Sequence, residues 1–212
     1  MTTTAIATYQ CPACRRSYAA DRPLWRCDCG SHLNLATGQG LTRDKIAVGE
    51  ASLWRYAAAL ALRGPPRVSL GEGWTPLVRR DWQGVAVSFK LESQMPTGSF
   101  KDRGTAVMIN HLLEVGVGAI HEDSSGNAGA SIATYAAAAG IPCRIYVPAS
   151  APRAKLVQIA AAGADVRPIP GTRHDVTEAA LSAVDESFYA SHNWQPFFIE
   201  GTKTLEIGRA HV

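Results

Sequence analysis

The stretch Ala119-Ile-His-Glu-Asp-Ser-Ser-Gly-Asn-Ala-Gly-Ala-Ser131 decides the fold, because a short strand-like run passes through small polar residues directly into an alanine-rich segment. This pattern predicts a strand over 119–123 and a helix over 127–139. It recurs along the chain: further strands are expected over 85–91, 143–147 and 165–167, and further helices over 100–115, 152–162 and 173–187. Such alternation is typical of βαβ units. The sequence therefore predicts an α/β fold, an open, mostly parallel sheet with helices on both faces.

The overall composition argues against several classes of function. The chain has 212 residues, of which 46% are hydrophobic, and its net charge of +3 is spread out without a run of five like charges. A nucleic-acid-binding arm is therefore not expected. No apolar stretch approaches the roughly 20 residues that span a membrane, and the first residues lack the features of a signal peptide. We expect a cytoplasmic protein with neither a membrane nor a nucleic-acid partner.

One loop places a lysine at the start of a predicted helix. It reads Met95-Pro-Thr-Gly-Ser-Phe-Lys-Asp-Arg-Gly104, so that Lys101 lies in the first helical turn. The helix dipole and any burial disfavour an ammonium group there, and the pKa of the amine should fall toward the range in which it forms an imine. An ordinary surface lysine is the alternative.

A second loop lies at the turn after residue 123. Ser124, Ser125 and Gly126 offer hydroxyl groups and backbone amides to an anion at the start of the helix that begins with Asn127. The alternative is a plain helix start with a serine as its N-cap.

Together and in this order, with 26 residues from Lys101 to Asn127, the two loops resemble those of the fold type II pyridoxal-phosphate-dependent enzymes. The resemblance implies a fold like that of the tryptophan synthase beta subunit, with pyridoxal 5′-phosphate bound to Lys101 as a Schiff base. It also implies that Asn127 bonds the cofactor's 3′ oxygen. The substrate carboxylate would be held by Ser124, Ser125, Gly126 and Ala128.

Within this family, three features resemble the threonine synthases: Ser69-Leu-Gly-Glu-Gly-Trp-Thr-Pro-Leu-Val78, the Lys90-Leu-Glu that precedes the lysine motif, and a cysteine-rich N-terminus. The resemblance implies a lyase of threonine biosynthesis, a homodimer at full length. It would convert O-phospho-L-homoserine and water to L-threonine and phosphate through a pyridoxal-phosphate aldimine, with Lys101 moving the protons. Better-studied members carry threonine where Ser125 stands. A threonine or serine dehydratase, or another type II enzyme of β-elimination or β-replacement, therefore remains the alternative.

Four of the five cysteines gather near the N-terminus in two close pairs on either side of a 12-residue loop. In a reducing compartment such pairs favour metal ligation over disulfides. We expect a zinc-ribbon-like module in which four thiolates surround a structural zinc ion. His32 is an alternative ligand, and a metal-free ribbon is the alternative to zinc. The expected ligands are Cys11, Cys14, Cys27 and Cys29.

The resemblance also divides the chain. We expect the zinc-ribbon-like module over 1–40, a connector and the start of a large domain over 41–84, a small α/β domain with both loops over 85–195, and the start of the return to the large domain over 196–212. The tail Ile207-Gly-Arg-Ala-His-Val212 matches what a sequencing adapter encodes, and the family's glycine-rich loop for the cofactor phosphate does not precede it. We therefore expect a truncated chain with an artefactual tail, inactive by itself. A natural short paralogue and a non-catalytic fragment are the alternatives.

Overall fold

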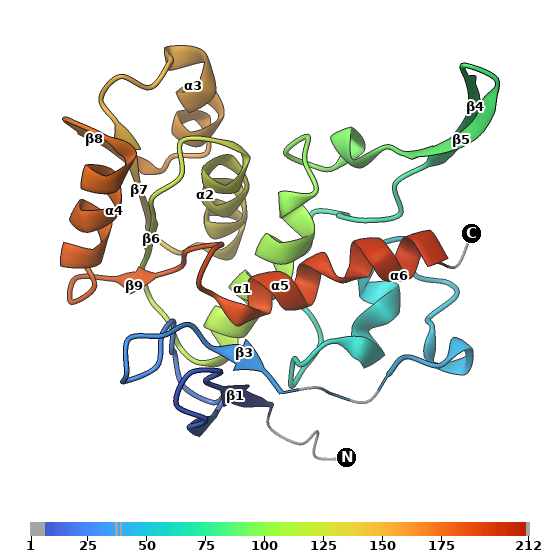
Figure 1. Cartoon of the computed structure of the whole chain (residues 1–212), viewed down its shortest axis with the longest axis horizontal. Coiled ribbons are helices and arrows are strands. Elements are labelled where there is room, and N and C mark those ends of the chain that lie inside the picture. Colours follow the sequence, from blue (N-terminus) through green and yellow to red (C-terminus); the bar gives the residue numbers. More distant parts are fainter. Residues whose placement is uncertain (1–6, 37, 39, 211–212) are drawn as a thin grey trace.

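A computed structural model describes residues 7–36, 38 and 40–210 (Figure 1). At its centre lies a four-stranded sheet with the strand order β8-β7-β6-β9. Every pair of neighbours in this sheet is parallel. Its strands are β6 (Ile120–Glu122), β7 (Cys143–Pro148), β8 (Asp165–Ile169) and β9 (Phe188–Tyr189).

Helices cover both faces of this sheet. Helix α4 (Arg173–Ser182) lies on one face, and α2 (Asn127–Ala139) with α3 (Arg153–Ala161) lies on the other (Figure 1). The predicted α/β fold with a parallel sheet is thereby confirmed. The expected helix over 173–187 is too long, because α4 ends at Ser182 and a short strand, β9, follows it.

Helix α1 (Lys101–Glu114) forms the centre of the larger hydrophobic core. All residues from Asp102 to Leu112 are buried, so the helix is enclosed on every side. It packs between α2 and α5 (Pro196–Thr202), and α6 (Thr204–Ala210) continues from α5 (Figure 1). Gly201 allows the close approach of α5, because a Cβ there would overlap the carbonyl oxygen of Arg103.

The expected first strand of the parallel sheet belongs to another sheet. Strand β5 (Val85–Lys90) pairs only with β4 (Leu77–Trp82), in an antiparallel hairpin that projects from the body of the molecule (Figure 1). Gln83 and Gly84 form its two-residue turn with positive φ angles of 51° and 80°, as a type I′ turn requires. The strand was correctly predicted, but its place in the parallel sheet was wrong, because the turn pairs it with its immediate neighbour.

A third small sheet carries the cysteines at the N-terminus. Its strands are β1 (Thr8–Gln10), β2 (Ser17–Ala19) and β3 (Asn34–Leu35), all antiparallel, in the order β2-β1-β3. The connector that follows contains 3₁₀ helices at Arg43–Lys45 and Leu53–Ala59, and a third lies at Glu92–Gln94. The division of the chain into four parts stays a prediction. Residues 1–6, 37, 39, 211 and 212, including the end of the tail, lie outside the described residues.

A buried contact between three side chains helps to join the N-terminal sheet to the core. The hydroxyl group of Tyr9 lies 2.8 Å from Nε2 of His111, on α1. The His111 ring stacks on Phe197 of α5, with ring centroids 3.5 Å apart. All three side chains are buried. The cysteine module therefore packs directly on the two helices next to the lysine loop.

Candidate active site

The lysine loop is clamped onto the start of α1 by a buried carboxylate. Asp102 accepts hydrogen bonds from the backbone amide of Thr97, at 2.7 Å, and from the hydroxyl group of Thr97. The next residue, Arg103, forms a buried ion pair with Glu92, at 2.7 Å. The side chains of Asp102 and Arg103, the two residues that follow Lys101, thus stabilise the structure. Lys101 is left as the residue of the first turn whose side chain is available for chemistry.

The Lys101 side chain is half-buried between aromatic rings. Its Nζ lies 4.7 Å from the ring centroid of Phe100 and 5.5 Å from that of Phe198. Burial lowers the pKa of the amine, and the carboxylate of Glu122 partly opposes this effect. In the described ranges Lys101 takes part in no ion pair. A lowered pKa and a free amine are the properties that a lysine needs to form an imine.

The serine-glycine loop connects β6 to α2 at the carboxyl edge of the sheet, where ligands bind in parallel α/β folds. Gly126, not a serine, is the N-cap of α2, and no side chain caps the first turn. Asn127 and Gly126 are exposed, and Ser124 and Ser125 are half-buried, whereas Ala128 is buried. The helix start is therefore open to an anion, since the amides at a helix N-terminus need an acceptor.

The two loops are brought together through the first turns of their helices. The hydroxyl group of Ser131, on α2, donates to Asp102 at 2.6 Å and lies 2.8 Å from the hydroxyl group of Thr105, on α1. Lys101 and Asn127 thus begin two helices that are bonded to each other within about one turn. The lysine loop, however, does not follow a strand of the parallel sheet as the sequence argument assumed. It follows the hairpin and a 3₁₀ turn.

Two titratable residues beside these loops were missed by the sequence argument. Glu122, the last residue of β6, is fully buried and lies 2.7 Å from Nδ1 of His192. A charged pair Glu122-Asp123 at the end of a buried strand was a visible signal for the first of them. No sequence signal indicated His192, because it follows β9, a strand that was not predicted.

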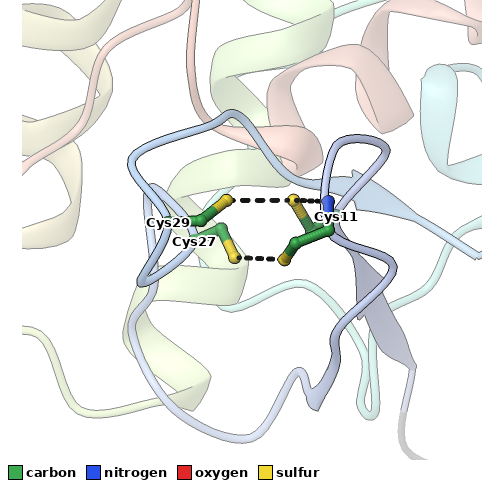
Figure 2. A group of neighbouring side chains, drawn as sticks. Cys11, Cys27 and Cys29 are labelled. Atoms are coloured by element: carbon green, nitrogen blue, oxygen red, sulfur yellow. Dashed lines mark hydrogen bonds between the residues drawn. The ribbon is translucent and has the colours of Figure 1, made fainter.

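The four N-terminal cysteines form one cluster. Their sulfur atoms all lie within 4.8 Å of one another (Figure 2). None forms a disulfide, and His32 is exposed and outside the cluster. A hydrogen bond from the Tyr18 hydroxyl group lowers the pKa of Cys27 to about 6, which favours the thiolate, the form that binds metal. The donor set and its spacing fit a tetrahedral zinc ion.

Comparisons with known proteins agree with this geometry. A family model described as pyridoxal-phosphate dependent enzyme matches residues 68–207. The threonine synthase of Methanocaldococcus jannaschii is 32% identical over 209 residues, which cover 92% of this chain and 52% of that protein. The threonine synthase of Methanosarcina acetivorans is 31% identical over 207 residues, or 92% of this chain and 51% of that protein. The chain therefore spans about half the length of these curated relatives.

Solved structures give the same family. A pyridoxal 5′-phosphate-dependent aspartate racemase has a TM-score of 0.60 and 26% identity, and covers 65% of this chain and 45% of its own. The processed form of threonine deaminase isoform 2 from Solanum lycopersicum has a TM-score of 0.57 and 25% identity, covering 64% of this chain and 40% of its own. No helix in the described ranges is long and apolar enough to cross a membrane. Since the family model matches well over half of its residues, the chain belongs to the pyridoxal-phosphate-dependent enzymes.

Proposed function

We propose that this chain carries the lysine site of a threonine synthase, which converts O-phospho-L-homoserine and water to L-threonine and phosphate. The observation that carries the proposal is the bonded pair of helix starts, one with the free, half-buried amine of Lys101 and the other with an uncapped serine-glycine loop. The similarity to two threonine synthases over 92% of the chain supports the choice of substrate, because it extends well beyond the residues that the family model matches.

Each residue of the two loops then has a role. Lys101 binds pyridoxal phosphate covalently and moves protons at the substrate carbons, while Asn127 bonds the cofactor ring. Ser124, Ser125, Gly126 and Ala128 hold the substrate carboxylate with hydroxyl groups and with the amides of the uncapped helix start. The bound cofactor supplies the electron sink that stabilises negative charge on the substrate. The protein's part is to lower the pKa of the amine by burial and to hold the carboxylate in place.

The role of Lys101 is tested by labelling. The protein is mixed with pyridoxal phosphate, reduced with borohydride and digested, and the labelled peptide is found by mass spectrometry. We expect the label on Lys101, and we expect Lys101→Ala to lose both the label and the visible absorbance of the bound cofactor. Lys155→Ala is the matched control, since Lys155 is an exposed lysine near the start of α3, and it should keep both. Undiminished labelling of Lys101→Ala would contradict the proposal.

The substrate is tested by comparing two products of the full-length enzyme, because the 212-residue chain is expected to be inactive by itself. A threonine synthase releases phosphate from O-phospho-L-homoserine, whereas a threonine or serine dehydratase releases ammonia from the hydroxy amino acid. The similarity to a threonine deaminase makes the dehydratase the second candidate. We expect phosphate release with a kcat/KM at least tenfold above that for ammonia release. The reverse ratio would assign the dehydratase. That the 212-residue chain is inactive by itself stays a prediction.

For the cysteine module we propose a structural zinc ion bound by Cys11, Cys14, Cys27 and Cys29. The four free thiols in close pairs also suit the reducing conditions of the cytoplasm, where we place the protein as a homodimer.

Zinc binding is tested by metal analysis of the purified protein. We expect about one zinc ion per chain, and we expect Cys14→Ser to lose it and to lower the free energy of unfolding by several kcal/mol. Cys143→Ser is the control, because Cys143 lies on β7 outside the cluster. A native protein that holds no zinc after purification in its presence would contradict the proposal.

A further inference from the structure

The buried carboxylate of Glu122 is not used by either loop. It lies at the end of β6, directly before the serine-glycine loop, and is completely shielded from solvent. Both of its oxygen atoms are bonded by one residue. His192 approaches Oε1 with Nδ1 at 2.7 Å and donates its backbone amide to Oε2 at 3.2 Å. The two hydrogen bonds fix both the backbone and the ring of His192 relative to Glu122.

The sheet explains why these two residues meet. Strand β9 pairs with β6 in parallel, with His121 opposite Tyr189. Because parallel neighbours end at the same edge, the chain after β9 leaves the sheet where the serine-glycine loop also leaves it. His192 therefore lies at the carboxyl edge of the sheet, next to the candidate active site.

A buried carboxylate needs a compensating partner, and His192 is suited to be that partner. Burial raises the pKa of Glu122, and the bond to His192 opposes this rise. The neighbouring Asp123 is already bonded to Arg173 at 2.8 Å, and also to Thr177 and Tyr189. The charged and titratable groups that face Glu122 are Lys101, Asp123, Cys143, Tyr189 and His192.

The second ring nitrogen of His192 is available for a ligand. Nδ1 is bonded to Glu122, and within the described part of the chain no residue bonds Nε2. The side chain is 16% exposed, so the ring is not sealed in the core. Phe198 lies beside both His192 and Lys101, with its ring centroid 5.8 Å from the imidazole and 5.5 Å from Nζ. The imidazole, whose orientation Glu122 fixes, and the amine of Lys101 therefore share Phe198 as a neighbour.

We propose that His192, oriented by Glu122, is a second proton-transfer group of the Lys101 site. The inference rests on the proposed function. In that reaction the carbon that carries the phosphate loses it with the bonding electron pair and gains a proton, and a neighbouring carbon gives up a proton before water adds there. Nε2 takes the proton from the neighbouring carbon and delivers it to the carbon that has lost the phosphate. The hydroxyl group of water bonds to the neighbouring carbon and the remaining proton of the water goes to the departing phosphate, so the exchange balances. Glu122 is the positioning residue that holds Nδ1 throughout.

The first test measures proximity and needs no turnover. The cofactor is reduced onto Lys101 with borohydride, and the Cε1–H resonance of each histidine is followed by NMR against pH. We expect the His192 resonance to move on labelling, and that of the exposed His174 to stay. If Lys101 takes no cofactor, the proposed function fails together with this inference. If Lys101 is labelled and His192 does not respond, this inference alone is overturned.

The second test, made on the full-length enzyme, separates proton transfer from packing. His192→Asn keeps an amide nitrogen near the position of Nδ1, so it can still bond Glu122, but it has no Nε2. We expect cofactor absorbance to be kept, kcat to fall about 100-fold or more and KM to change little. Glu122→Gln should lower kcat less and shift the acid limb of its pH profile, since an amide does not stabilise a proton on the imidazole.

His174→Asn is the matched control, since His174 also pairs with a glutamate, Glu178, but on the surface of α4. It should behave like the native protein. A kcat of His192→Asn within threefold of the native value, with an unchanged pH profile, would overturn the assignment.

Discussion

Gly129, in the first turn of α2, has no room for a side chain. A Cβ at this position would overlap the carbonyl oxygen of Ser124 and would lie 3.2 Å from the side chain of Ile159. A backbone oxygen cannot rotate away, so Gly129→Ala must displace the serine-glycine loop. We expect a loss of about 1–3 kcal/mol in the free energy of unfolding, measured with urea, together with weaker retention of the cofactor.

Gly118→Ala is the matched control for this change. No atom lies within 4 Å of a Cβ built at Gly118, and its φ angle is not in the left-handed region. We expect its free energy of unfolding to stay within about 0.5 kcal/mol of the native value. Equal stability of the two variants would show that the loop has more freedom than its close contact with α2 indicates.

At the scale of secondary-structure elements, local signals could be read from the sequence and non-local ones could not. The helix over 127–139 was predicted with its observed bounds, because Gly126 precedes it and Gly140 ends it in the left-handed conformation, with φ 69°. The helix over 173–187 was drawn too long. Its end at Ser182 carries no glycine or proline, and the strand that follows has only two residues, too few to show a period.

The same distinction applies to the elements of the site. The lysine loop and the serine-glycine loop are continuous segments, so their order and spacing could be recognised. The Glu122–His192 pair could not, because the pairing of β9 with β6 joins residues about 70 positions apart. Strand β5 shows the reverse case. Its composition predicted a strand, but only the positive φ angles at the turn before it reveal that its partner is β4.

At the scale of the whole molecule, His111 connects the cysteine module to the helices of the candidate site. Its ring bonds the hydroxyl group of Tyr9 in the N-terminal sheet and stacks on Phe197 of α5, and it is 1% exposed. Burial lowers its pKa to about 3, with a smaller contribution from the positive charge of Arg63. A proton on His111 is therefore strongly disfavoured in the packed arrangement, and acid should weaken the contact between the module and α1 as it unfolds the protein.

The pH dependence of stability follows from this lowered pKa. The ordinary value for histidine is 6.5, so below about pH 6.5 the unfolded chain binds a proton at His111 that the folded chain does not bind until about pH 3. The contribution of this group to stability is therefore complete above pH 6.5 and falls between pH 6.5 and pH 3, by about 1.4 kcal/mol per pH unit.

In urea unfolding between pH 6 and pH 4, we expect His111→Gln to be less stable than the native protein at pH 6 but to lose less stability on acidification. The carboxyl groups are common to both proteins and cancel in the difference of slopes. His174→Gln, at a histidine 78% exposed, should retain the native slope, whereas equal slopes for all three proteins would show that His111 is accessible to protons in the folded state.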